Sequence, residues 1–211
     1  MKNIMFDVDG TIFDTVEGVS ASILYALEKM GEKPLPAETL RKFIGPPLID
    51  GFMQFAGFSE EKANTAIAYY REFYTPKGVY MAKLYDGIES LFSDLYNAGK
   101  NLFVISSKPT VFVQKLFAKY NIDKYFKDIA EVRFDNCEIS KADLIESVIK
   151  KYGLDISDTV MIGDRKFDID GAKEIGVRSI GVTYGFGSRD ELLRHGADFI
   201  ADSAEEIKKY I

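Results

Sequence analysis

Pairs of acidic residues stand where apolar, strand-like segments of the sequence end. Asp7 and Asp9 close the segment that begins at Asn3, and alternation along a strand would direct both carboxylates to the same side. Two like charges this close repel each other, so the pair needs a shared proton or a cation. Carboxylate oxygens with no sulfur or histidine nearby favour magnesium over zinc. The alternative is a simple strand-to-loop turn, because Asp and Gly are common turn formers.

A second acidic pair, Asp164 and Asp168, follows another short apolar segment, Val160–Ile162. Ligands of open parallel sheets bind at the carboxyl ends of the strands, so both acidic pairs would converge at one place. Taken alone, Asp164 has a structural alternative, since it would also suit the N-cap of the following helix. The combined pattern favours a shared metal site.

Hydroxyl and ammonium groups form a third set of candidates. Ser106, Ser107 and Lys108 follow the apolar segment Leu102–Ile105 at the start of a helical pattern, and Lys141 opens a later one. Hydroxyls, free backbone amides and the positive end of a helix stabilise phosphate, and a fixed lysine charge stabilises a phosphoryl group. The alternatives are ordinary: serines before a helix serve as N-caps, and a lone lysine is usually a solvated surface residue.

Apolar segments of strand character alternate with amphipathic helical patterns through most of the chain, which predicts an α/β fold with a parallel sheet covered on both faces. The further expected strands are Ile129–Phe134, Ser179–Val182 and Phe199–Ala201, and the expected helices are Ile88–Ala98, Val111–Tyr120, Lys141–Tyr152 and Ile169–Ile175. Residues 16–80 break this rhythm with successive helical stretches. We therefore expect an all-helical domain, 16–80, inserted into a core built from 1–15 and 81–211.

Composition excludes several classes of protein. The 211 residues include 27 Lys and Arg against 33 Asp and Glu, and the net charge of −6 argues against binding of a nucleic acid polymer. No apolar stretch approaches the ~18 residues that span a bilayer, and the start of the chain lacks a signal-peptide core, so we expect a cytoplasmic protein without membrane contact. One cysteine, Cys137, and one histidine, His195, exclude an intramolecular disulfide and a zinc site that needs either type twice.

The ordered set Asp7-x-Asp9-Gly10-Thr11, Ser106, Lys141 and Gly163-Asp164-x-x-x-Asp168 resembles the four motifs of the haloacid dehalogenase superfamily. The resemblance covers the whole chain and implies a Rossmann-like three-layer core with a helical cap after the first strand. It also implies that Asp7 is a nucleophile forming an aspartyl phosphate and that Asp9 is the general acid and base. Mg²⁺ would be held by Asp7, the Asp9 carbonyl and Asp164, with Asp168 in support. Ser106, Ser107 and Lys141 would bind the phosphoryl group, and Thr11 would orient Asp9.

The stretch from Arg41 to Leu48 is similar to one in the phosphoglycolate phosphatase and 5′-nucleotidase-like branch of that superfamily. A small phosphomonoester is therefore the expected substrate, phosphoglycolate or a nucleoside monophosphate above all. Arg41 and Lys108 are candidates for contact with its remaining groups, although an exposed helix arginine is an ordinary feature. The alternatives are phosphotransfer or a phosphomutase reaction on a sugar phosphate, and a low-turnover binding or regulatory module. A monomer or a small homo-oligomer is expected.

Overall fold

The chain divides into two compact units. The computed structural model describes residues 1–130, 132–133 and 139–211, so Cys137 and Phe134 lie outside the described residues. The first unit combines Met1–Asp14 with Leu84–Ile211, and the second is the continuous segment Thr15–Lys83. Each unit is described below by itself.

The first unit is built on a six-stranded parallel sheet with the strand order β5-β4-β1-β6-β7-β8. The predicted α/β class with a parallel sheet is thereby confirmed. The strands are β1 (Asn3–Phe6), β4 (Asn101–Val104), β5 (Phe126–Ile129), β6 (Thr159–Gly163), β7 (Arg178–Val182) and β8 (Phe199–Ala201). A separate two-stranded pairing joins β2 (Phe13–Asp14) to β3 (Lys83–Leu84).

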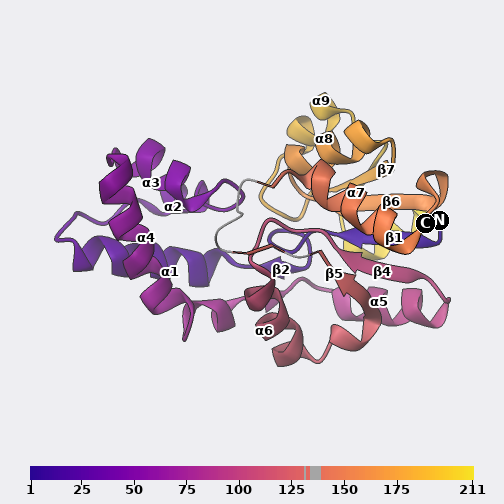
Figure 1. The fold of residues 1–211 in the computed structure, drawn as a ribbon, viewed down its shortest axis with the longest axis horizontal. Coiled ribbons are helices and arrows are strands. Elements are labelled where there is room, and N and C mark those ends of the chain that lie inside the picture. Colours follow the sequence, from indigo (N-terminus) through magenta and orange to yellow (C-terminus); the bar gives the residue numbers. More distant parts are fainter. Residues whose placement is uncertain (131, 134–138) are drawn as a thin grey trace. The chain divides into compact units, whose positions relative to one another are not determined.

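Helices cover both faces of the sheet, with α7 and α8 on one face and α5 and α6 on the other (Figure 1). This arrangement follows from the parallel strands, because each return to the same end of the sheet requires a crossover. The helices of this unit are α5 (Ile88–Asn97), α6 (Thr110–Tyr120), α7 (Lys141–Tyr152), α8 (Lys166–Ile175), α9 (Arg189–His195) and α10 (Ala204–Ile207). Single turns of 3-10 helix are η2 (Asp123–Tyr125), η3 (Ile156–Asp158) and η4 (Lys208–Tyr210).

Strand β1 is central, and all four of its residues are buried. Successive side chains of a strand point to opposite faces, and Met5 joins a core cluster with Leu144 and Val148 of α7. Its neighbour Phe6 packs edge-on against Phe92 of α5, with ring centroids 5.1 Å apart. Apolar contacts on both faces therefore fix the end of β1, from which the chain continues directly into Asp7.

Two predicted boundaries were wrong, each for a local reason. The strand expected from Ile129 instead ends there, because β5 occupies Phe126–Ile129 at the edge of the sheet. Ala130, directly after it, is buried in the core, and its backbone N–H still donates to the Val104 carbonyl of β4 at 2.9 Å. Helix α8 begins at Lys166, three residues before the expected start, because Asp168 accepts a hydrogen bond from the backbone N–H of Arg165 at 3.1 Å.

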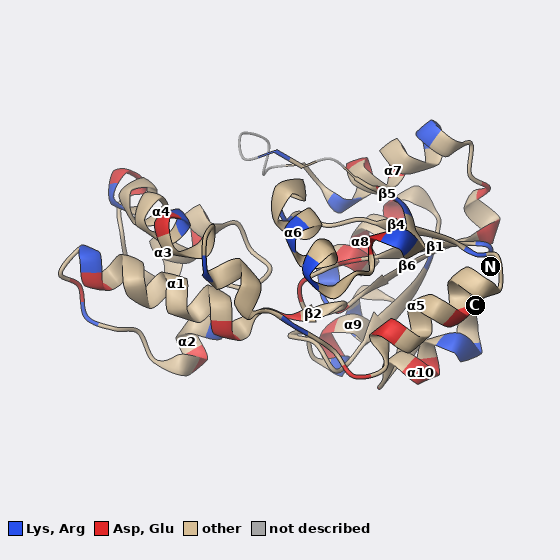
Figure 2. Ribbon diagram, turned by 90° about the horizontal axis from the view of Figure 1, so that it is seen from below, with Lys and Arg blue, Asp and Glu red and all other residues tan. Residues whose placement is uncertain are grey.

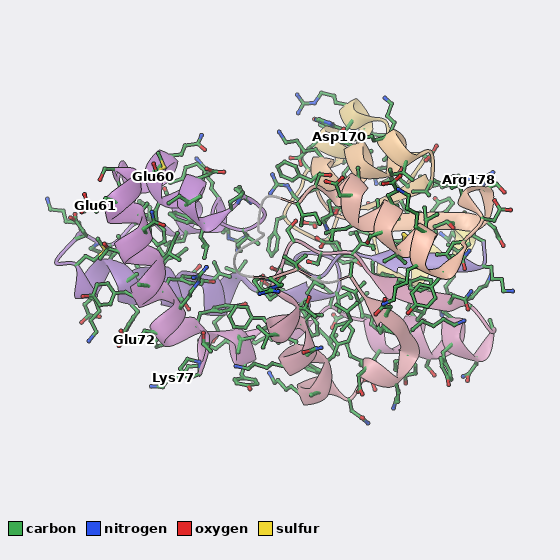
Figure 3. The ribbon with its side chains drawn as sticks, viewed as in Figure 1. Glu60, Glu61, Glu72, Lys77, Asp170 and Arg178 are labelled. Atoms are coloured by element: carbon green, nitrogen blue, oxygen red, sulfur yellow. The ribbon has the colours of Figure 1, made fainter. Side chains whose placement is uncertain are left out.

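The second unit contains α1 (Val16–Lys29), α2 (Ala37–Arg41), α3 (Leu48–Ala56), α4 (Glu60–Tyr74) and the 3-10 turn η1 (Gly78–Met81). Aromatic side chains fill much of its core. Phe43 packs edge-on against Phe52, with centroids 5.2 Å apart. On the α1–α4 pair, the Tyr25 hydroxyl donates to Glu72, which is labelled in Figure 3. Acidic and basic residues are interspersed along the helices of both units (Figure 2).

Candidate active site

Three buried carboxylates meet at the carboxyl ends of the neighbouring strands β1 and β6. Asp7 directly follows β1, Asp164 directly follows β6, and Asp168 lies in the first turn of α8. One carboxylate oxygen from each lies within 4.8 Å of the others. Because β1 and β6 are paired in register from Asn3 to Phe6, the sheet itself places these ends side by side. The structure therefore brings these three predicted residues together.

Lys141 joins this cluster through contacts with Asp7 and Asp168. Its Nζ lies 2.6 Å from Asp7 Oδ1 and 2.8 Å from Asp168 Oδ1, and it donates to the carbonyl of Ile105 at 2.9 Å. The lysine is the first residue of α7, whose start is fixed by a capping box between Ser140 and the third residue of the helix. Its side chain is only 8% exposed, so the alternative of a solvated surface lysine does not apply.

Burial and charge perturb each of these groups. Burial lowers the pKa of the Lys141 ammonium, but Asp168 and Asp7 outweigh this effect, and the net pKa lies above its usual value. Burial raises the pKa of Asp168 to about 6, with Asp7 adding to the rise and Lys141 opposing it. Burial, followed by the nearby Asp168 and Asp7, raises the pKa of Asp164 well above its ordinary range. The cluster thus concentrates more negative charge than its one lysine offsets.

A divalent cation fits this set of donors. The carboxylates of Asp7, Asp164 and Asp168 are hard oxygen ligands, and their oxygens are close enough together to share one small ion. Binding of a cation would also relieve the mutual repulsion that adds to the effect of burial in raising the pKa of Asp164. The residues present therefore suit Mg²⁺ better than a metal that prefers sulfur or imidazole.

Asp9 lies beside this cluster and has a different partner. Lys108 Nζ is 3.0 Å from both carboxylate oxygens of Asp9. Ser106 is buried, and its Oγ accepts the backbone N–H of Lys108 at 3.3 Å. Ser107 is exposed. Thr11 donates its hydroxyl to Asp164 at 3.4 Å, which differs from the Asp9 contact that the family resemblance suggested.

The loop after β7 completes the surroundings of Asp164, and none of its residues was among those predicted for the site. The backbone N–H of Phe186 donates to Asp164 Oδ2 at 2.7 Å. Gly185 lies so close that a Cβ there would stand 2.5 Å from the Asp164 Cβ and 2.3 Å from the Gly10 carbonyl oxygen. A Cβ on Gly187 would stand 1.9 Å from the Asp164 carbonyl oxygen. Only glycine leaves room for this close approach. The Gly-x-Gly spacing after an apolar strand was therefore the sequence signal that could have identified this loop as part of the site.

Tyr184 ties the same loop to the first acidic segment. Its hydroxyl donates to the Thr11 carbonyl at 3.1 Å, and its ring packs 4.9 Å from that of Tyr85. Burial, and then the charge of Asp164, raise the pKa of Tyr184, so the hydroxyl keeps the proton that it donates. The loop therefore holds Asp164 by a backbone amide and the Asp7–Thr11 segment by a side chain.

Arg41 belongs to the second unit. It is the last residue of α2, and its side chain is exposed. His195, which is the one histidine of the sequence, ends α9 and pairs at 2.8 Å with Asp170 of α8, which is labelled in Figure 3. Among the helices that the structure describes, none is both long and apolar enough to cross a membrane.

Comparison with known proteins points to one family. The family model described as haloacid dehalogenase-like hydrolase matches residues 4–182. A 5′-nucleotidase of Pseudomonas aeruginosa is 41% identical over 193 residues, which span 92% of this chain and 87% of that protein. A phosphoglycolate phosphatase of Vibrio parahaemolyticus is 26% identical over 219 residues, with 100% of this chain and 96% of that protein covered.

A solved structure shows the same fold. The crystal structure of a predicted phosphatase from Clostridium acetobutylicum superposes with a TM-score of 0.90 and 40% sequence identity. The match covers 98% of this chain and 96% of that one. The similarity therefore extends over both units of the chain.

Proposed function

Because the chain belongs to the haloacid dehalogenase-like hydrolase family and is a phosphatase, we propose that it hydrolyses a small phosphomonoester through an aspartyl phosphate on Asp7, with Mg²⁺ as cofactor. The observation that carries this proposal is the buried cluster of three carboxylates around Lys141. It supplies a nucleophile, a fixed positive charge and the ligands for a divalent cation.

The first half-reaction transfers the phosphoryl group to the protein. An oxygen of Asp7 forms a bond to phosphorus while the bond from phosphorus to the leaving oxygen breaks. Asp9 gives its proton to that oxygen, which departs as an alcohol. We assign to Lys141 the stabilisation of the negative charge on the phosphoryl oxygens, and its Nζ, 2.6 Å from Asp7 Oδ1, supports this role. The Ser106 hydroxyl donates to the same oxygens.

The second half-reaction returns the protein to its starting state. Water attacks phosphorus and gives a proton to Asp9, and the bond between phosphorus and the Asp7 oxygen breaks. Inorganic phosphate is released and Asp7 is again a carboxylate. One neighbouring acid thus serves both steps, first as proton donor and then as proton acceptor.

Mg²⁺ would be held by Asp7, Asp164 and the backbone carbonyl of Asp9. When bound, it offsets the repulsion between these carboxylates and an anionic phosphate. Asp168 acts through Lys141, whose ammonium it contacts at 2.8 Å. It also accepts a hydrogen bond from the backbone N–H of Arg165, so it fixes both the lysine side chain and the start of α8.

Two substrate classes are proposed, phosphoglycolate and nucleoside monophosphates. The relatives named phosphoglycolate phosphatase and 5′-nucleotidase support them, and the more similar of these two relatives is the 5′-nucleotidase. Arg41 is proposed to contact the part of the substrate beyond the phosphate, because its guanidinium suits a carboxylate or another planar anion. Ser107, exposed next to Ser106, is proposed to contact phosphate.

The test compares two acid-to-amide variants. Asp7→Asn should lower Mg²⁺-dependent phosphate release from p-nitrophenyl phosphate by at least about 10³-fold, because the amide oxygen is a poor nucleophile. Asp170→Asn is the matched control, since Asp170 is an exposed acid of α8 that pairs with His195 at 2.8 Å on the surface. Retention of wild-type turnover by Asp7→Asn would reject the aspartyl phosphate. A panel of phosphoglycolate, nucleoside monophosphates and sugar phosphates then identifies the preferred class.

A further inference from the structure

The side chains of the Lys108–Asp9 ion pair are less exposed to solvent than those of surface ion pairs. The Lys108 ammonium lies 3.0 Å from each oxygen of Asp9, so it contacts both ends of the carboxylate. The lysine side chain is 6% exposed and that of Asp9 is 23% exposed. A shielded contact of this kind restricts the rotation of the carboxyl group more than an exposed one, which solvent and salt weaken.

The local backbone holds Lys108 in place. Its amide donates to Ser106 Oγ at 3.3 Å, and Pro109 follows as the N-cap of α6 with its φ at −51°. A lysine immediately before a helix is electrostatically unfavourable, because the amino end of a helix carries a partial positive charge. Helix stability therefore does not explain a lysine here, whereas contact with Asp9 does.

Resting on the proposed function, we infer that Lys108 is a positioning residue for the Asp9 carboxyl group. In the acid step its ammonium donates to one carboxyl oxygen, so that the other oxygen, which carries the proton, faces the leaving oxygen of the substrate. The Lys108 ammonium already has a hydrogen-bond partner in Asp9, 99 residues away in the sequence. The phosphoryl group has its own ammonium partner in Lys141, next to Asp7. Lys108 thus acts on the substrate through Asp9, which differs from the direct substrate contact expected from the sequence.

A positioning role and a substrate-binding role predict different kinetics. Loss of a group that binds the substrate equally in the ground and transition states raises KM, whereas loss of orientation of the general acid lowers kcat. The orientation of a proton donor also matters most for a poor leaving group. An alkoxide must be protonated as it departs, but p-nitrophenolate leaves readily as an anion. The two roles are therefore separated by comparing alkyl and aryl phosphates.

The experiment compares Lys108→Met with the wild type in the presence of Mg²⁺. The substrates are p-nitrophenyl phosphate and the alkyl phosphomonoester that the wild type hydrolyses fastest. We expect kcat/KM for the alkyl substrate to fall by on the order of 10²-fold, against less than about 10-fold for the aryl substrate, with KM changed by less than about threefold. Lys108→Arg, which keeps the charge, should recover part of the loss on the alkyl substrate.

Lys151→Met is the matched control, because Lys151 pairs with Asp128 at 2.6 Å on the exposed part of α7 and should show wild-type kinetics. A rise in KM with equal losses on both substrates would overturn the positioning role, as would wild-type activity of Lys108→Met. Asp7→Asn, assayed in parallel, separates this failure from failure of the proposed function. If Asp7→Asn is inactive and Lys108→Met is unaffected, only the role of Lys108 is rejected.

Discussion

The two units of this protein contain ion pairs of almost equal length in opposite surroundings. In the α/β unit, Lys141 lies 2.6 Å from Asp7, and the two side chains are 8% and 12% exposed. In the helical unit, Lys83 lies 2.8 Å from Glu17, and these side chains are 71% and 54% exposed. The distances differ by little, but only the first pair has lost most of its contact with water.

Burial therefore decides what each pair does. An exposed pair interacts in a medium of high dielectric constant and contributes little to stability. A buried charge has lost its hydration and depends on its partner, so removal of one member is costly. The α/β unit tolerates such a pair at the carboxyl end of β1, while the Lys83–Glu17 pair of the helical unit stays in solvent.

The largest effect on stability is expected for Lys141→Met. This change leaves Asp7 and Asp168 buried without their ammonium partner, and it should lower the free energy of unfolding by about 3–5 kcal/mol. Urea unfolding in EDTA, followed by circular dichroism, measures it without a contribution from metal. Lys151→Met, on the same helix but exposed, should leave the unfolding midpoint unchanged. A loss below about 1 kcal/mol for Lys141→Met would show that the buried ion pair contributes no more to stability than the exposed one.

An intermediate effect is expected from magnesium. An ion that binds only the folded protein stabilises it by about 2.7 kcal/mol at one hundred times its Kd. The wild type should therefore melt at a higher temperature when Mg²⁺ replaces EDTA in a thermal scan. Asp164→Asn removes one of the clustered carboxylates and should abolish most of this shift. An equal shift in both proteins would place the bound ion elsewhere.

The smallest effect is expected for Lys83→Met in the helical unit. Its partner Glu17 remains solvated after the change, so the free energy of unfolding should fall by less than about 1 kcal/mol. The remaining effect should also shrink at 1 M salt, because screening weakens exposed pairs. Urea titrations at low and high salt test both points, and a loss as large as that of Lys141→Met would contradict the comparison.

The sequence was sufficient to predict the parts of the fold that local patterns specify. Helix α7 has the expected bounds, Lys141–Tyr152, because Ser140 caps its start and Gly153 ends it in the left-handed conformation. The strands β1 and β6 lie where the apolar segments ended in acids. The same pattern, an apolar segment followed directly by an acid, placed Asp7 and Asp164 at the carboxyl ends of neighbouring strands.

The features that sequence reasoning missed depend on groups without a local signature. The Phe186 contribution to the site is a backbone N–H, which any residue but proline would supply. The pairing of Lys108 with Asp9 joins residues 99 positions apart. The early start of α8 depends on Asp168, whose carboxylate accepts from Arg165 while it also contacts Lys141. Each of these contacts is determined by the assembled fold.

The position of β1 has a consequence for how the protein is made. Asn3–Phe6 are synthesised long before the two strands that flank β1, which begin only at Asn101 and Thr159. The helical unit, Thr15–Lys83, is continuous and is fully synthesised before either of them exists. We therefore expect the helical unit to fold during translation, while the apolar first strand waits for most of the chain and depends meanwhile on chaperones or on its short length to avoid aggregation.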